Sequence, residues 1–219
     1  MAGHDWFRTS AWNDENAAGF EERLKRVRPA NRAEYVRIQG HHLVSSTDPS
    51  IREAGRLMLE RVIREYPYNF EAKFACEQLA ANLAAEGRLE ESEMAYRRTI
   101  VMCKQSPIGY SGGSGVPELF LAEVLLRMDG RAVDAWELLE DVESRVAAQN
   151  LIRDTVYRHL LASARAAREL GLPSAPDFAV RALAVADESE PAIPRHPNIG
   201  RPDPSDAERK ELGDIASGR

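Results

Sequence analysis

Residues 79–99 read LAANLAAEGRLEESEMAYRRT, and this stretch decides the fold. Apolar residues recur at helical spacing on both sides of Gly87, and a glycine directly after such a run is typical of a helix C-terminus. Leu89 begins the second run, in which Ser92 and Thr99 are small and Tyr96 is large. Small side chains let two helices approach closely, while large ones fill the gap to a neighbouring pair. The stretch therefore predicts a helical hairpin.

Helix signals continue outward from this hairpin over most of the chain. Asn13, Asp48 and Asn69 stand as caps before helical runs, and Asn31 with Glu34 three residues later resembles a capping box. No window shows the period-two alternation of a strand. The sequence therefore predicts an all-α chain. The helical runs cover about 13–29, 31–43, 48–66, 69–87, 89–100, 117–128, 133–146, 151–170 and 177–186.

The hairpin pattern repeats along the chain. Met58, Tyr96, Leu139 and Leu183 occupy equivalent places, at separations of 38, 43 and 44 residues. Four hairpins in phase favour an array of stacked pairs over an ordinary helical bundle, which is the alternative. The further marker residues are Gly40, Leu43 and Ala54 in the first copy, Leu79, Ala80, Leu83 and Gly87 in the second, Leu121, Ala122, Leu125, Gly130 and Ala135 in the third, and Leu160, Ala164, Gly171, Ala179 and Ala186 in the fourth.

This arrangement of markers resembles the tetratricopeptide repeat (TPR), a helical hairpin of about 34 residues. The resemblance implies a right-handed α-solenoid of about four TPR-like hairpins with an N-terminal capping helix. The segment Asp5-Trp6-Phe7-Arg8 and Arg195-His196-Pro197 also resemble bacterial proteins of this type. Only four of the 29 basic residues are lysine, a bias typical of GC-rich bacterial genomes.

The predicted organisation has three parts. Residues 1–30 form an N-terminal cap segment, 31–189 form the TPR-like repeat domain, and 190–219 form a proline-rich tail. Because proline density prevents continuous helix there, the tail holds at most one short helix after Asp203-Pro204. That helix is either docked or mobile. A chain of 219 residues favours one large domain over two small ones.

Composition limits the classes of partner. The net charge is −6, which argues against strong attraction to nucleic acid or to an anionic membrane. No apolar run reaches the length of a membrane span, and the N-terminus lacks a secretory signal. Two cysteines fit a reducing compartment, so a cytoplasmic location is expected. One stretch, 23–37, carries a local charge of +5. Either this charge attracts an acidic partner or mediates head-to-tail association, or its side chains are exposed on helices and pair with nearby groups of the same chain.

Chemistry-bearing motifs are sparse. The five histidines lack ligand spacing, Cys76 occupies a core position, and no nucleophile or phosphate-loop motif occurs. We therefore expect no metal, no cofactor and no enzymatic activity. The glycine-rich segment Gly109–Gly115 is either a linker between repeats or a loop that closes over a bound ligand.

The TPR resemblance also implies a concave groove lined by the first helix of each pair. A protein or peptide segment is the expected partner, bound by an adaptor without catalysis. The alternative is a regulatory sensor that binds a small ligand in the groove. The lysine/asparagine clamp of chaperone-tail-binding members is not reproduced, which argues against a C-terminal carboxylate ligand. The positions mapped to the groove are Arg37, His41, Glu77, Gln78, Glu123, Arg127, Arg158, His159 and Arg165.

Three aromatic residues precede the first repeat. Trp6, Phe7 and Trp12 are expected to pack the capping helix onto the first hairpin, because a repeat array exposes its ends. The alternative is a homo-oligomer formed through this aromatic segment, since tryptophan is enriched in binding hot spots.

Overall fold

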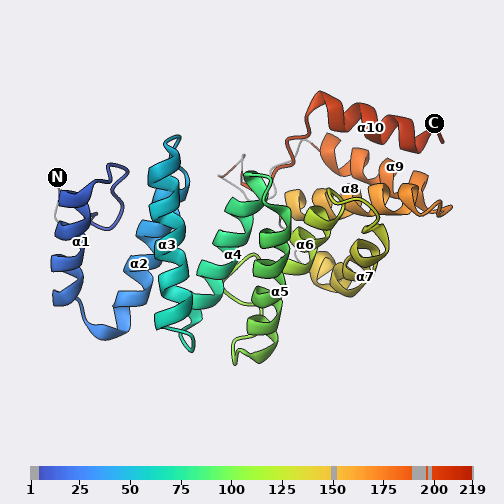
Figure 1. The fold of residues 1–219 in the computed structure, drawn as a ribbon. Helices are drawn as coiled ribbons and strands as arrows, with labels where there is room; N and C mark the ends of the chain where they lie inside the picture. The colour runs from blue at the N-terminus through green and yellow to red at the C-terminus, as the bar shows by residue number, and fades with distance from the viewer. Residues whose placement is uncertain (1–4, 149–151, 189–195, 197–198, 219) are drawn as a thin grey trace. The chain divides into compact units, whose positions relative to one another are not determined.

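The computed structural model describes residues 5–148, 152–188, 196 and 199–218. Ten helices and no strand occur in these residues, which confirms the all-α prediction (Figure 1). Within the same ranges, no helix combines the length and the apolar character needed to cross a membrane. The chain divides into two compact units that meet in sequence at Ser114 and Gly115. This boundary falls inside the range 31–189 that was predicted as one repeat domain.

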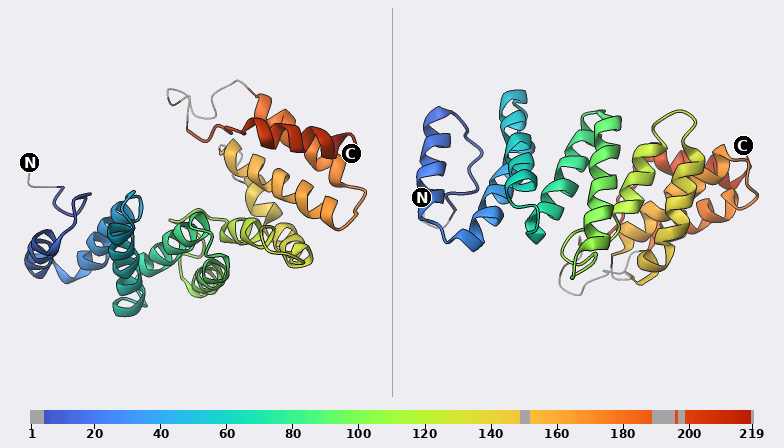
Figure 2. Two further views of the ribbon diagram at one scale, coloured as in Figure 1. Left: turned by 45° about the horizontal axis from the view of Figure 1, so that its top comes forward. Right: turned by 60° about the horizontal axis from the view of Figure 1, so that its bottom comes forward.

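Unit 1 contains two helical pairs. Helix α2 packs against α3, and α4 packs against α5, each pair being antiparallel (Figure 2). Helix α4 also contacts α2 and α3, so the second pair stacks directly on the first. The described helices of unit 1 are α1 (Asp14–Arg26), α2 (Pro29–Val44), α3 (Pro49–Glu65), α4 (Phe70–Ala85) and α5 (Leu89–Gln105).

Small residues hold the helices of each pair in unit 1 close together. A Cβ on Gly55 of α3 would lie 2.6 Å from the backbone nitrogen of Val44 and 2.8 Å from the carbonyl oxygen of Gly40. No larger residue fits there without moving the backbone. In the second pair, Ser92 Oγ donates to the carbonyl oxygen of Ala80 at 2.8 Å. The predicted role of small residues at these hairpins is therefore confirmed.

Most predicted helix caps are present. The side chains of Asn13, Asp48 and Asn69 each accept a hydrogen bond from a backbone N–H in the first turn of the next helix. The capping box predicted at Asn31 is wrong, because α2 already begins at Pro29. Proline has a helical φ and lacks only an N–H that a first-turn residue leaves unused, so Pro29 starts this helix.

The turns inside three pairs use glycines in the left-handed region. Gly87 has a φ of 77°, Gly130 of 72° and Gly171 of 66°. Non-glycine residues rarely adopt such values. These are the turn glycines that the repeat markers identified.

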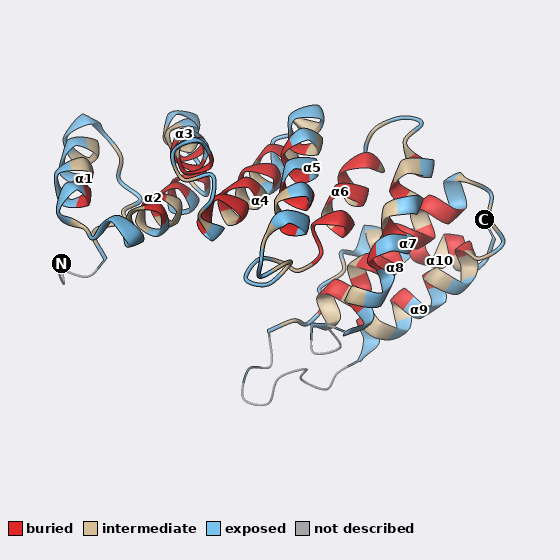
Figure 3. Ribbon diagram, turned by 90° about the horizontal axis from the view of Figure 1, so that it is seen from below, coloured by how far each residue is buried: buried red, intermediate tan, exposed pale blue. Residues whose placement is uncertain are grey.

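The core follows the faces at which neighbouring helices meet, as the burial colours show within each unit (Figure 3). Cys76 is only 1% exposed, and its thiol donates to the carbonyl oxygen of Ala95 at 3.2 Å. Burial raises the pKa of this thiol. Cys103 is also buried. The predicted core role of Cys76 is confirmed.

The N-terminal aromatic residues form one cluster with α1 and α2. Phe7 stacks on Tyr35 with a centroid separation of 4.3 Å, and Trp6 contacts both Tyr35 and Phe20. Trp12 meets Phe20 edge-on at 5.8 Å. These contacts pack the segment onto the first hairpin, as the capping interpretation predicts.

A buried amide fixes the same segment to α2. The side chain of Gln39, fully buried, donates to the carbonyl oxygen of Thr9 at 2.7 Å and accepts from the Thr9 N–H at 3.1 Å. This two-point hydrogen bond sets the register of the segment against α2.

Unit 2 contains two further antiparallel pairs and a last helix. Helix α6 packs against α7, α8 packs against α9, and the pairs meet through α7 and α8 and through α6 and α8. Helix α10 lies on α9 and α8. The described helices of unit 2 are α6 (Pro117–Leu125), α7 (Ala132–Ala148), α8 (Arg153–Glu169), α9 (Ala175–Asp187) and α10 (Asp206–Ala216).

The last helix of the proline-rich tail is docked. Leu212 is fully buried and Ile215 is 3% exposed, and both belong to the apolar cluster between α8, α9 and α10. Ser205 caps α10 with a complete capping box that includes Glu208. Residues 190–195 and 197–198, in the first part of the predicted tail, lie outside the described ranges, as do residues 1–4, 149–151, 189 and 219.

Candidate peptide-binding faces

The nine predicted groove residues fall into two sets, one in each unit. In both sets they lie on the first helices of pairs or directly after one. Unit 1 contributes Arg37 and His41 from α2 and Glu77 and Gln78 from α4; unit 2 contributes Glu123 from α6, Arg127 from the turn after α6, and Arg158, His159 and Arg165 from α8.

Arginines on these helices are neutralised from within the protein. Arg37 on α2 forms an ion pair with Glu71 on α4, whose side chain is 5% exposed. In unit 2, Arg165 Nη2 lies 2.7 Å from a carboxylate oxygen of Glu211 on α10. A ligand carboxylate would have to displace an internal acid that is already in place at either arginine.

Arg158 repeats this arrangement between α8 and α6. Its guanidinium forms a two-point ion pair with Glu123, and the Nε to Oε1 distance is 2.8 Å. The same group lies 4.5 Å from the ring centroid of Phe120. Burial raises the pKa of Glu123, and the nearby Arg158 only partly offsets this effect. The predicted peptide-reading pair Glu123 and Arg158 is thus a structural link between two first helices.

His159 is a core residue, and its assignment to a groove surface is wrong. Its side chain is 6% exposed, and its Nε2 donates to the carbonyl oxygen of Leu139 on α7 at 3.0 Å. Burial lowers the pKa of the ring. Consecutive residues on a helix point about 100° apart, so His159 turns towards α7 while Arg158 faces α6.

The remaining groove positions differ in exposure. His41 is exposed on α2, and its pKa is lowered by partial burial and by the nearby cation of Arg37. Arg127 is exposed in the turn after α6. Gln78 is half-buried, and within the described part of the chain its Oε1 accepts no hydrogen bond.

The glycine-rich segment is attached to α4 by both of its ends. Lys73 Nζ donates to the carbonyl oxygens of Gly109 at 2.8 Å and Ser111 at 2.9 Å. The carboxylate of Glu77 accepts hydrogen bonds from the backbone N–H and the hydroxyl group of Ser114. Glu77 therefore holds this loop, and the segment is docked rather than free to close over a ligand.

The centre of this docked loop packs on an aromatic ring. A Cβ on Gly112 would lie 2.4 Å from Phe74 Cζ, and its φ is 91°. A Cβ on Gly113 would lie 2.4 Å from Glu77 Oε2. Both glycines let the loop backbone approach α4 closely.

The start of α4 and the turn before it carry three aromatic residues that we call the aromatic face: Tyr68, Phe70 and Phe74. Phe70 is 53% exposed, the Tyr68 side chain is fully exposed, and the rings of Phe70 and Phe74 lie 5.6 Å apart. Two cations flank Phe74, with Arg37 at 5.7 Å and Lys73 at 5.3 Å from its ring centroid.

Sequence reasoning assigned neither Phe70 nor Phe74 to a binding site, and it missed the exposure of Phe70. The available signal was the spacing of four residues between the two phenylalanines, directly after the cap Asn69. That spacing places both rings on one side of a helix. Whether the Phe70 ring is covered depends on the position of the neighbouring loop, and the spacing of the two phenylalanines does not predict that position.

Three cations of the basic stretch 23–37 have partners inside the protein. Lys25 pairs with Glu22 at 2.5 Å, and Arg32 donates to the carbonyl oxygens of Val27 and Lys25. Arg37 is likewise held by Glu71. The steering of an acidic partner by this stretch stays a prediction.

The described residues include no group of three or more metal-ligating side chains positioned to hold an ion. Both cysteines are buried, and the raised pKa of Cys76 disfavours its thiolate. No protein-family model, curated protein or solved structure matches this chain. The described first helices thus present an ion-paired surface, with an exposed aromatic patch at the start of α4.

Proposed function

We propose that this chain is a non-catalytic scaffold, built as a right-handed α-solenoid of TPR-like hairpins, that binds a peptide segment. Successive antiparallel pairs support the solenoid, because first helices contact each other in both units, α2 with α4 and α6 with α8. Within each unit, such stacking leaves a first-helix surface for recognition.

The aromatic face of unit 1 is the proposed binding site, and its exposure is the observation that carries the proposal. Two large aromatic side chains, Tyr68 and Phe70, stand in solvent, and the ring of Phe70 lies 5.6 Å from that of Phe74. Aromatic residues bury large areas at low entropic cost, so they are favoured anchors for a partner. The ion pair of Arg37 with Glu71 and the docked loop hold the surrounding surface rigid.

The chemistry of this face favours an apolar peptide. Because Glu71 already neutralises Arg37, an acidic tail gains little there. A peptide that presents leucine, methionine or aromatic side chains would bury apolar surface against Phe70 and Tyr68. One form of the sensor alternative uses the Gly109–Gly115 loop as a lid over the ligand, and the attachment of this loop to α4 gives that form no support.

A random peptide library displayed on phage tests the proposal. The full-length protein is the bait, and the selected peptides are then measured against Tyr68→Ala combined with Phe70→Ala. We expect peptides rich in apolar residues, and a rise in Kd of at least about tenfold for the double variant. The matched control is Val180→Ala in unit 2, which truncates a side chain of similar exposure, 55%.

Results of three kinds would contradict the proposal. One is a selection that enriches no peptide above background. Another is a set of peptides that bind the double variant and the wild type equally well while circular dichroism shows both folded. Equal losses in the double variant and in Val180→Ala would likewise point away from the aromatic face.

A further inference from the structure

A second surface of unit 1, formed by α3 and α5, carries features that peptide binding on α4 does not use. Three of its large apolar side chains stand in solvent: Leu57 is 56%, Met94 64% and Val101 50% exposed. We call this surface the α3–α5 face. Its residues are Leu57, Glu60 and Arg64 on α3 and Glu91, Met94, Arg98 and Val101 on α5.

The spacing of these residues is that of a helix-packing seam. On α5 they are separated by three, four and three positions, and on α3 by three and four. This is the alternation with which apolar positions recur in coiled coils. Each helix therefore presents a continuous outward stripe suited to contact another helix.

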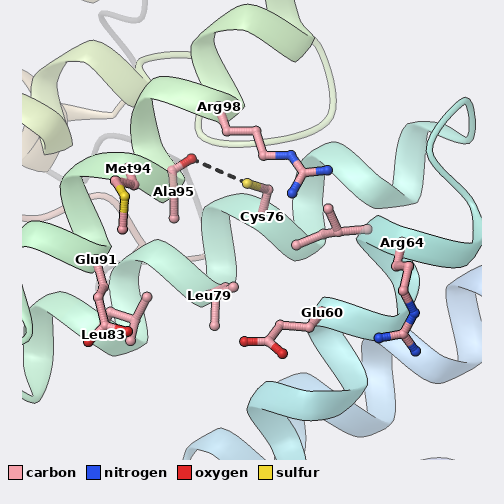
Figure 4. Close-up of a pocket in the computed structure, with 10 residues that line it drawn as sticks. Glu60, Arg64, Cys76, Leu79, Leu83, Glu91, Met94, Ala95 and Arg98 are labelled. Atoms are coloured by element: carbon pink, nitrogen blue, oxygen red, sulfur yellow. Dashed lines mark hydrogen bonds between the residues drawn. The ribbon is translucent and has the colours of Figure 1, made fainter.

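A cavity lies between the two stripes. Its volume is about 450 Å³, and Glu60, Arg64, Met94 and Arg98 stand at its rim (Figure 4). Apolar side chains of α3, α4 and α5 dominate its floor, which also contains the Cys76 thiol. The floor residues are Ile63, Cys76, Leu79, Leu83 and Ala95.

The rim carries one unpaired charge of each sign. Arg64 lies 3.4 Å from Glu65, and Glu91 pairs with Arg88 at 2.6 Å. Glu60 and Arg98 are exposed, and neither has an ion-pair partner within the described ranges. They stand on opposite walls, Glu60 on α3 and Arg98 on α5.

We propose that the α3–α5 face binds a second copy of this chain in an isologous dimer. A two-fold axis places α3 of one protomer against α5 of its partner, so that each Glu60 meets the partner's Arg98. The exposed Met94 and Leu57 of each copy enter the apolar cavity of the other. Burial of these side chains supplies the affinity, and the two charge pairs set the register.

Self-complementarity is the reason for choosing a second copy over a foreign helix. The face contains both members of each complementary pair. Its exposed apolar side chains match its own apolar cavity, and the carboxylate of Glu60 matches the guanidinium of Arg98. An acidic or a basic partner helix would satisfy only one of the two charges. An isologous contact pairs both charges, and the two-fold axis forms this pair at two places in the interface.

Charge exchange between protomers tests the proposal. Glu60→Arg and Arg98→Glu each place two like-charge pairs across the interface, so each variant alone is expected to raise the dimer Kd by at least about tenfold. Mixed in equal amounts, the two variants restore both pairs in a heterodimer. Sedimentation velocity over about 1–100 μM measures these changes, against a chain mass of 24.4 kDa.

Arg97→Glu is the matched control. It reverses a charge on the same helix, one residue before Arg98, but Arg97 pairs with Glu93 and points about 100° away from the seam. We expect its dimer Kd to stay within about twofold of the wild type.

Three outcomes would overturn the proposal. A wild type that is monomeric at every concentration excludes the dimer. A dimer that both Glu60→Arg and Arg98→Glu leave intact uses another surface, such as the N-terminal aromatic segment. A mixture of the two reversed variants that stays monomeric excludes the Glu60–Arg98 pairing. Peptide binding at the aromatic face is measured separately and is unaffected by any of these results.

Discussion

Single residues decide whether the first-helix surface of unit 1 keeps its shape. Glu77 was predicted to face a ligand, yet both Glu77 and the neighbouring Lys73 are bound to the glycine-rich loop. Gly112 completes this attachment because only a residue without a Cβ fits against Phe74 at a φ of 91°. The loop is therefore part of the surface that flanks the aromatic face.

Gly112→Ala is expected to release this loop. The added methyl group collides with the Phe74 ring and strains the backbone, a combined cost of about 1–3 kcal/mol. Limited proteolysis should then cleave the segment 109–114 at least several times faster than in the wild type, and Phe74 should become accessible. The measurement is the cleavage rate under native conditions, followed by mass spectrometry of the fragments.

Gly109→Ala is the control for Gly112→Ala. Gly109 also has a positive φ, 55°, but a Cβ there meets nothing within 4 Å. If both substitutions accelerated cleavage equally, the close contact with Phe74 would not be what holds the loop.

At the scale of helices, the sequence predicts the elements well and their side-chain partners poorly. Caps, turn glycines and small contact residues act within one turn or one hairpin, so Asn69, Gly87 and Ser92 could be assigned correctly. Ion pairs made by the first-helix arginines join residues 34 to 46 positions apart. Such pairings depend on how the helices stack. For this reason Arg37 and Arg165 were predicted to be ligand donors, although each pairs with an internal glutamate.

The stability of α10 is a second property that depends on contacts distant in sequence. Its sequence offers only Leu212, Ile215 and a few alanines as apolar residues, too little to stabilise an isolated helix. Docking supplies the missing stabilisation. Helices α8 and α9 bury the side chains of Leu212 and Ile215, and Arg165 pairs with Glu211. Helix α10 thus covers the apolar surface that the fourth pair would otherwise expose.

Leu212→Ala is expected to undock α10. Removing a fully buried leucine side chain costs about 2–5 kcal/mol, which exceeds what a capping box contributes to a helix of 11 residues. Hydrogen exchange at the amides of 206–216 should become at least tenfold faster. Lys210→Ala is the control, because its side chain is 80% exposed on the same helix. Unchanged exchange in Leu212→Ala would show that α10 is held by other contacts.

For the whole molecule, the division into two units implies two cores with separate stabilities. Each unit has its own buried residues, and each has its own tryptophans. Trp6 and Trp12 lie in the aromatic cluster of unit 1, whereas Trp136 contacts Phe178 in unit 2. Fluorescence can therefore follow the unfolding of each unit in the intact chain.

Leu212→Ala should lower the unfolding midpoint of unit 2 selectively. In a Trp136→Phe background the remaining tryptophans report unit 1, and in a Trp6→Phe, Trp12→Phe background Trp136 reports unit 2. Repeat arrays couple mainly through nearest neighbours, so the urea midpoint seen by Trp136 should fall by about 1 M or more. The midpoint seen by Trp6 and Trp12 should change much less at the same protein concentration. Equal shifts in both backgrounds would show that the chain unfolds as one cooperative unit, in agreement with the single domain that its length suggests.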